Sequence, residues 1–103
     1  MTSTNMNTEF DKSKVYLHDT GFKQWVCIIK SIKESFVYYE SNVCIEPTSS
    51  GTLYSGGHNS LGKGVRLATE DEISKANSLL KRTGESFRFP SNNLNTIPNY
   101  DIY

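Results

Sequence analysis

Hydrophobic and polar positions alternate along the first half of the chain in the manner of β-strands. Residues 14–18 form a short run of β-branched and aromatic side chains, KVYLH, and the turn signal DTG follows it. Two longer runs at 22–32 and 36–45 flank the polar tripeptide KES. The pattern predicts a first strand and then a β-hairpin, which ends at Pro47 because proline lacks the N–H that a central strand needs.

The second half of the chain contains one clear helix signal. Thr69 and Glu72 have the spacing of a capping box, and the acidic first turn suits the positive end of a helix dipole. The apolar positions at helical spacing are Ile73, Ala76, Leu79 and Leu80. Together with Gly84 as a stop signal, they predict an amphipathic helix over about 70–83, after a short extended segment at 65–68.

The order of these elements predicts the fold class. Phe87 and Phe89 indicate a short closing strand after the helix. Strands followed by one helix predict an α+β fold, either a small antiparallel sheet or an SH3-like barrel, with one C-terminal amphipathic helix. We expect one compact domain over 14–90, with a flexible N-terminal tail at 1–13 and an Asn-rich C-terminal tail at 91–103.

Size and charge limit the number of hydrophobic cores and the classes of partner that we expect. A chain of 103 residues can build one hydrophobic core, and aromatic residues compensate for a hydrophobic fraction of only 36%. Eleven basic residues balance eleven acidic ones, so net charge provides no general attraction to nucleic acid or to an anionic membrane. The sequence has no apolar run of membrane-spanning length and no signal-peptide pattern, and we therefore expect the chain in the cytoplasm.

The segment 48–64 stands out because it holds five of the seven glycines. We expect a long loop with one short edge strand at 52–55, and such loops inside compact domains are usually functional or disordered. The residues predicted to contact a ligand or partner are Tyr54, His58, Asn59, Lys63 and Arg66. The alternative is that the glycines only serve turns and that the cations are solvated.

Part of this segment resembles a phosphate-binding loop. Residues 57–63, GHNSLGK, match the G-x-x-x-x-G-K part of a P-loop. Gly64 then occupies the position of the magnesium-binding Ser or Thr, and 65–67 is predicted as a strand where the P-loop needs a helix. A P-loop is therefore disfavoured, but a glycine-rich loop can still present N–H groups and positive charge to an anion or nucleotide. The positive charge of such a site would come from His58, Lys63 and Arg66.

The cysteines and histidines do not form a recognisable chemical site. Cys27 and Cys44 lie in apolar runs, and we expect reduced, buried thiols because cytosolic disulfides are rare. With His18 and His58 they would number four zinc ligands, but structural zinc sites bring paired ligands two to four residues apart. Neither thiol has the electropositive setting of a catalytic cysteine. We expect no metal, no cofactor and no catalytic residue.

Lysines among aromatic residues favour a different alternative, a stacking surface for single-stranded nucleic acid. The lysines are Lys12, Lys14, Lys23, Lys30 and Lys33, and the aromatics include Trp25, Phe36, Tyr38 and Tyr39. Acidic residues interrupt the series, so no continuous basic stripe is present. Nucleic acid is therefore a less favoured partner.

The segment RLATEDE, residues 66–72, forms the predicted junction between strand and helix. It resembles the closing segment of many small phage-encoded proteins, in which a β-rich body ends in an RLAT-type strand followed by an acidic helix start. The resemblance covers 65–82 and implies a bacteriophage accessory protein that acts by binding. It brings no catalytic residues. The Asn-, Lys-, Ser- and Tyr-rich composition is similarly that of an AT-rich phage genome.

The sequence thus favours a non-enzymatic binding protein, a phage accessory or anti-defence factor that binds and inhibits a host protein. Its contact surface would be the loop at 48–64 together with exposed aromatic side chains. The first alternative is a sponge or sensor that binds a nucleotide-type small molecule with the same loop, and the second is a nucleic-acid-binding module. Exposed β edges also lead us to expect a homo-oligomer.

Overall fold

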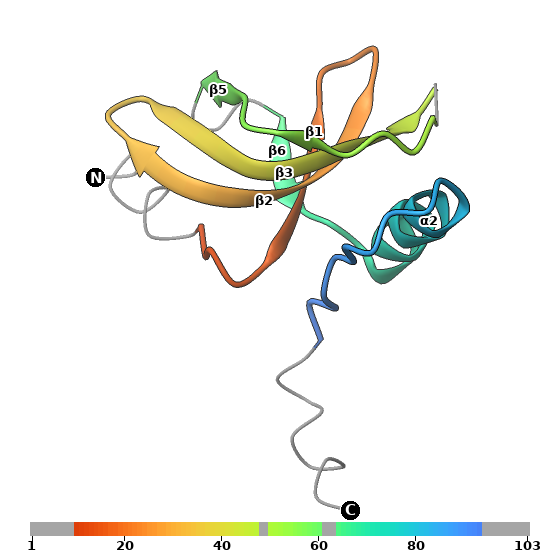
Figure 1. Cartoon of the computed structure of the whole chain (residues 1–103). Helices are drawn as coiled ribbons and strands as arrows, with labels where there is room; N and C mark the ends of the chain where they lie inside the picture. The colour runs from red at the N-terminus through yellow and green to blue at the C-terminus, as the bar shows by residue number, and fades with distance from the viewer. Residues whose placement is uncertain (1–9, 48–49, 61–63, 94–103) are drawn as a thin grey trace, which may run out of the picture.

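The computed structural model describes residues 10–47, 50–60 and 64–93. Its elements are β1 (Val15–Asp19), β2 (Gln24–Lys33), β3 (Phe36–Glu46), β4 (Tyr54–Ser55), β5 (His58–Ser60), β6 (Val65–Leu67) and α2 (Glu70–Arg82) (Figure 1). The strands form one antiparallel sheet in the order β4-β3-β2-β1-β6, and β5 pairs with a second part of β3. The predicted α+β fold with one C-terminal helix is confirmed.

The sheet is open, so of the two predicted forms the antiparallel sheet is present and the closed SH3-like barrel is wrong. Strand β6 pairs with β1 at one edge, while β4 and β5 pair with β3 at the other, and no pairing within the described ranges joins the two edges. The long β2–β3 hairpin shifts register between Ile28 and Ser31. Such irregularities bend a hairpin and increase its twist, and β2 and β3 curve accordingly in Figure 1.

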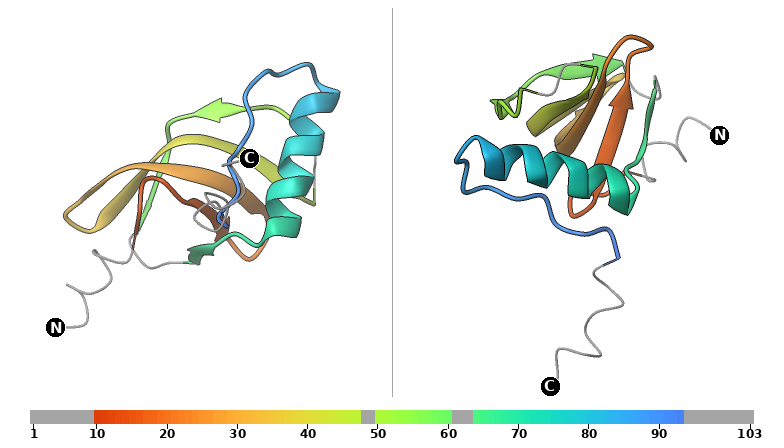
Figure 2. Two further views of the ribbon diagram at one scale, coloured as in Figure 1. Left: turned by 90° about the horizontal axis from the view of Figure 1, so that it is seen from below. Right: turned by 90° about the vertical axis from the view of Figure 1, so that its right-hand side faces the viewer.

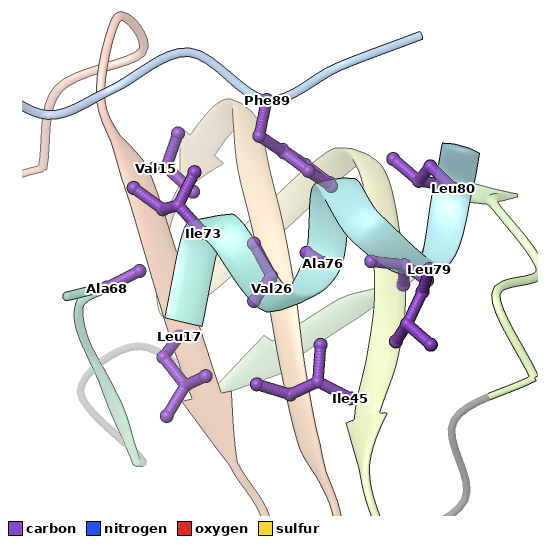
Figure 3. Close-up of a cluster of buried hydrophobic side chains, with 11 residues drawn as sticks. Val15, Leu17, Val26, Ile45, Ala68, Ile73, Ala76, Leu79, Leu80 and Phe89 are labelled. Carbon is purple, nitrogen blue, oxygen red and sulfur yellow. The ribbon is translucent and has the colours of Figure 1, made fainter. Parts of the chain in front are cut away.

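Helix α2 lies along one face of the sheet, as the two views of Figure 2 show. The buried core between them contains Val15, Leu17, Val26, Val43, Ile45, Ala68, Ile73, Ala76, Leu79, Leu80 and Phe89 (Figure 3). Each large aliphatic side chain in this core stabilises the fold by roughly 1.5–3 kcal/mol. The helix begins with the predicted capping box, in which Thr69 Oγ1 accepts from the N–H of Glu72. Among the described residues, no helix is long and apolar enough to cross a membrane.

A second buried cluster lies on the opposite face of the sheet. It consists of Tyr16, Cys27, Ile29, Val37 and Tyr39, with Phe10, Ile32 and Val65 packed against it. Consecutive residues of a strand point to opposite faces, so the strands that bury Val15 and Val26 under the helix present Tyr16 and Cys27 to this second side. Both faces of the central strands are therefore largely buried.

The predicted closing strand at Phe87 and Phe89 is wrong. Residues 83–93 contain no strand and instead run back along α2 (Figure 2). The side chain of Asn77 accepts from the N–H of Phe89 at 2.8 Å and donates to its carbonyl at 3.0 Å. The side chain of Asn77 thus bonds the backbone groups of Phe89 that a neighbouring strand would otherwise pair. The rings of Phe87 and Phe89 pack edge to face with centroids 5.0 Å apart.

The described parts of the two predicted tails contact the body of the protein. The ring of Phe10 lies 5.2 Å from that of Tyr16. The side chain of Asn92 accepts from the N–H of Val15 at 2.7 Å and donates to the carbonyls of Val15 and Ala68 at 2.8 and 3.1 Å. The remainder of each predicted tail lies outside the described residues.

Candidate functional site

The predicted loop at 48–64 contains β4 and β5, which pair with β3 on either side of a glycine turn. The first strand falls inside the edge strand expected at 52–55, whereas β5 was not predicted. Gly56 and Gly57 both have positive φ, 83° and 100°, which glycine adopts without strain. The turn is attached to β3, because Gly56 donates to Glu40 at 3.3 Å and Gly57 accepts from the N–H of Tyr39 at 3.0 Å. In addition, the Asn42 amide donates to the Gly56 carbonyl at 2.9 Å.

A cavity of about 190 Å³ opens beside this turn. Its lining residues are His18, Trp25, Cys27, Tyr39, Asn42, Gly56, Gly57 and His58. The β1–β2 register places His18 beside Trp25, and the Tyr39 ring stacks on His18 with centroids 5.9 Å apart and planes at 25°. Tyr54 extends the aromatic wall, because its ring meets that of Trp25 edge-on at 5.8 Å and is 50% exposed. We refer to His18, Trp25, Tyr39 and Tyr54 as the aromatic face.

Tyr39 contributes a buried polar group to this site. The residue is only 5% exposed, and its hydroxyl makes no hydrogen bond of ordinary geometry within the described part of the chain. Burial raises the pKa of Tyr39 well above its ordinary value, and the nearby Cys27 adds to the increase, while the side chain of Asn59 acts in the opposite direction. Leaving a buried hydroxyl without a strong partner costs about 1–3 kcal/mol. The hydroxyl is therefore protonated at neutral pH.

Two further titratable groups of the cavity, His18 and Cys27, are uncharged at neutral pH. Burial lowers the pKa of His18 from its ordinary 6.5, although Asp19 partly offsets this effect. Burial raises the pKa of the Cys27 thiol to about 12. The Cys27 Sγ donates to the carbonyl of Tyr16 at 3.5 Å and not to a histidine. A protonated thiol engaged with the backbone is not a nucleophile, so the arrangement suits binding better than Cys–His catalysis.

Three of the predicted contact residues lie at or near the cavity. Tyr54 packs edge-on against the Trp25 ring of the wall, Asn59 lies close to the Tyr39 hydroxyl, and His58 lines the cavity. The His58 ring, however, packs against Phe36 and Tyr38, with centroids 5.6 and 5.7 Å apart.

The other two predicted contact residues are not part of it. Arg66 pairs in register with Leu17, whose side chain faces α2, and it forms an ion pair with Glu72. The cavity opens on the other face of the sheet, beside His18 and Cys27, so Arg66 is not among its lining residues. Lys63 lies outside the described residues. Of the two predicted cations that are described, His58 lines the cavity and Arg66 lies on the other face of the sheet.

Sequence reasoning did not assign the cavity's central residues to one site. It named His18 only as a possible zinc ligand, and Trp25 and Tyr39 only as possible stacking residues. The available signal was the alternation along β1 and β2, which places His18, Trp25 and Cys27 on one side of their strands. Their meeting with Tyr39 depends on the strand register, which alternation alone does not determine.

A larger hollow, about 440 Å³, lies along the outer side of α2 next to Phe89 and Ser91. Two of its polar side chains are already engaged, because Glu70 accepts from the Ser91 hydroxyl at 2.7 Å and Asn77 bonds the backbone of Phe89. We therefore regard the smaller aromatic cavity as the candidate site. No cluster of three or more metal-ligating side chains occurs among the described residues.

The chain was also compared with known proteins. No protein family, curated protein or solved structure matches it.

Proposed function

We propose that this chain is a non-enzymatic binding protein that recognises its ligand with the aromatic face. The observation that carries the proposal is a cavity of about 190 Å³ whose wall includes the rings of His18, Trp25 and Tyr39. Concave sites lined mainly by aromatic and apolar side chains are the usual binding places of small molecules. The Cys27 thiol is protonated at neutral pH and donates to the carbonyl of Tyr16, which favours binding over nucleophilic chemistry.

A second candidate is a phage accessory or anti-defence factor that binds and inhibits a host protein. Phe22, at the tip of the β1–β2 turn, is 87% exposed. The neighbouring Lys23 reaches over the Trp25 ring, with its ammonium 5.9 Å from the ring centre, so this turn borders the aromatic face. Exposed aromatic side chains beside a pocket are typical of protein-binding surfaces. The resemblance at 65–82 supports the phage origin, and a homo-oligomer formed through exposed strand edges remains a prediction.

The single tryptophan of the chain provides the test, since Trp25 stands in the cavity wall. We would titrate the full chain with two fractions of a bacterial lysate, an ultrafiltered small-molecule fraction and the retained proteins, while recording Trp25 fluorescence. A saturable change with the small-molecule fraction is the expected result. A change with the proteins alone, reduced in Phe22→Ser, would favour the second candidate. Unchanged emission with both fractions would contradict the proposed function.

A further inference from the structure

We infer that the hollow along the outer side of α2 is a second binding site, which takes a small phosphorylated sugar and holds its phosphate between Lys81 and Arg88. The hollow is formed by the helix and the segment that follows it, and none of its lining residues belongs to the aromatic face. The inference is therefore independent of the proposed function. It rests on the alignment of that segment with the helix, on two cations without a carboxylate partner among the described residues, and on hydroxyl groups beside them.

Two sets of hydrogen bonds align the returning segment with α2. In the first turn of the helix, Glu70 accepts from the Ser91 hydroxyl at 2.7 Å. In its middle, Asn77 bonds both backbone groups of Phe89. The segment therefore runs antiparallel to the helix, and Figure 2 shows the two side by side. Because Arg88 precedes Phe89, it lies on the side of the last turn of the helix.

Lys81 and Arg88 give this end of the hollow two positive charges. Arg88 Nη1 donates to the carbonyls of Glu85 and Phe87, the latter at 2.7 Å, so the backbone holds the guanidinium in place and leaves its other N–H groups for a ligand. Among the described residues, neither cation forms an ion pair. The one carboxylate of the described lining, Glu70, lies at the opposite end of α2, about 16 Å away at 1.5 Å per residue. An anion bound between the two cations would therefore be attracted by both.

A phosphate monoester matches this pair of cations better than a carboxylate does. It carries a charge of about −1.5 to −2 at pH 7 and has three acceptor oxygens. The planar fork of an arginine fits two of these oxygens, and a lysine ammonium can bond the third. A carboxylate has only two oxygens and one charge, which Arg88 alone would satisfy. Lys81 also stabilises the negative end of the helix dipole, a role that by itself predicts no response to phosphate.

The rest of the hollow favours a hydroxyl-rich group over a flat ring. The exposed Ser74 and Ser78 line it, and their hydroxyls have no hydrogen-bond partner within the described ranges. A serine hydroxyl both donates and accepts, as a sugar hydroxyl does. Phe89, the single aromatic side chain of the described lining, is 3% exposed and offers no ring face to a nucleobase. The volume of about 440 Å³ lies in the usual range for small-molecule sites and accommodates a phosphorylated monosaccharide.

A phosphate monoester can also belong to a phosphoserine of a partner protein. The free small molecule is favoured, because the hollow offers little apolar surface to the side chains that would flank a phosphoserine. Its two large apolar residues, Ile73 and Phe89, are each only 3% exposed. Protein interfaces usually bury an apolar centre. A protein source predicts a different result, namely tighter binding by a phosphoserine peptide than by any sugar phosphate.

The experiment is a titration of the full chain with glucose 6-phosphate, inorganic phosphate and glucose, followed by calorimetry and by amide NMR shifts. We expect saturable binding of glucose 6-phosphate, weaker binding of inorganic phosphate and none of glucose, with shifts centred on Ser78, Lys81 and Arg88. Lys81→Gln and Arg88→Gln should each weaken glucose 6-phosphate by at least about tenfold. Lys33→Gln makes the same change of charge at an exposed position of β2 outside the hollow, and it should bind like the parent chain. The three replaced side chains are exposed, so we expect melting temperatures close to that of the parent chain.

Several results would overturn this site. They are the failure of glucose 6-phosphate to bind, unchanged affinity in both Lys81→Gln and Arg88→Gln, or an equal loss in Lys33→Gln, which would indicate a response to net charge alone. Shifts centred on Trp25 would place the ligand in the aromatic cavity and likewise overturn it. Binding of glucose as tight as that of its phosphate would overturn the role of the two cations. A phosphoserine peptide that binds more tightly than glucose 6-phosphate would overturn the small-molecule source. The proposed function has a separate readout, the response of Trp25 to lysate fractions, so either proposal can fail without the other.

Discussion

Arg66 and Glu72 form a two-pronged ion pair across the junction between β6 and α2. Arg66 Nη1 and Nη2 donate to Glu72 Oε1 and Oε2 at 3.0 and 2.8 Å. Glu72 Oε1 also accepts from the N–H of Thr69 at 2.9 Å, so one carboxylate serves both the ion pair and the capping box. The hydrogen bonds from Arg66 lower the pKa of Glu72. Arg66 therefore has a structural partner at the beginning of the helix.

We predict that Arg66→Ala lowers the free energy of unfolding by about 0.5–1 kcal/mol, because the pair is partly exposed and held in bidentate geometry. Arg66→Lys keeps the charge without the planar fork and should recover only part of the loss. Since the folded pKa of Glu72 lies below its ordinary 4.5, its contribution is present above about pH 4.5 and declines as pH falls through the folded pKa. The difference between Arg66→Ala and the parent chain should therefore shrink in acid.

Urea denaturation of these chains at neutral and acidic pH, with Trp25 fluorescence as the signal, measures this effect. The Arg66→Ala variant should retain the ligand response of the parent chain, because Arg66 lies on the other face of the sheet from the cavity. A normal free energy of unfolding combined with a lost ligand response would contradict this structural role. Such a result would restore the ligand-binding role expected from the sequence.

His18 should make the stability of the fold depend on pH. Burial lowers its folded-state pKa, so below about pH 6.5 the unfolded chain takes up a proton that the folded chain resists. The free energy of unfolding should therefore fall as pH decreases from about 7.5 to about 5.5. In His18→Asn this part of the dependence should disappear. Urea midpoints across this range test the prediction, and equal slopes for the variant and the parent chain would contradict it.

Elements with a strong local signal could be predicted from the sequence. The hairpin arms of β2 and β3 are long alternating runs, and α2 carries its own capping box and apolar stripe. Strand β5 could not be predicted, because its residues, His58-Asn59-Ser60, include no aliphatic side chain and pair only through contact with β3. The segment with Phe87 and Phe89 alternates like a strand, yet its backbone partner is a helix side chain, Asn77. In both segments, contacts with distant parts of the chain determine whether a strand forms.

The candidate site was less accessible to sequence reasoning than the fold. Its walls come from β1, β2, β3 and the glycine turn, which are brought together only by strand register. The absence of a good partner for the Tyr39 hydroxyl is a property of packing, and no residue pattern encodes it. The glycine-rich segment was singled out for its composition, and the structure adds that Gly56 and Gly57 line the aromatic cavity.

Asn92 is predicted to stabilise the body of the protein even though the sequence places it in a polar tail. Its side chain makes three hydrogen bonds, two to the backbone of Val15 and one to the carbonyl of Ala68. Asn92→Ala should lower the free energy of unfolding by about 1–3 kcal/mol, because the partly buried backbone groups lose their partner. Ser74→Ala, at an exposed position of α2, serves as the control, with an expected change within about 0.5 kcal/mol. Similar urea midpoints for the two variants would rule out this role.

Two buried tyrosines offer a final, matched comparison of stability. Tyr16 is 3% exposed and its hydroxyl accepts from the N–H of Asp11 at 2.7 Å, whereas the hydroxyl of Tyr39 is equally buried without such a partner. Tyr16→Phe should lower the free energy of unfolding by about 1 kcal/mol, because it removes a satisfied hydrogen bond. Tyr39→Phe should leave that free energy unchanged or raise it by up to about 1 kcal/mol, because it removes the cost of an unsatisfied group.

Thermal and urea unfolding of the two phenylalanine variants, without added ligand, gives the comparison directly. If Tyr39→Phe is destabilised as much as Tyr16→Phe, the Tyr39 hydroxyl has a strong partner within the protein, and the Asn59 side chain is the nearest candidate. If instead Tyr39→Phe is at least as stable as the parent chain, the hydroxyl is retained at a cost to the free fold. A residue that weakens the fold is expected at a functional site rather than in a structural core.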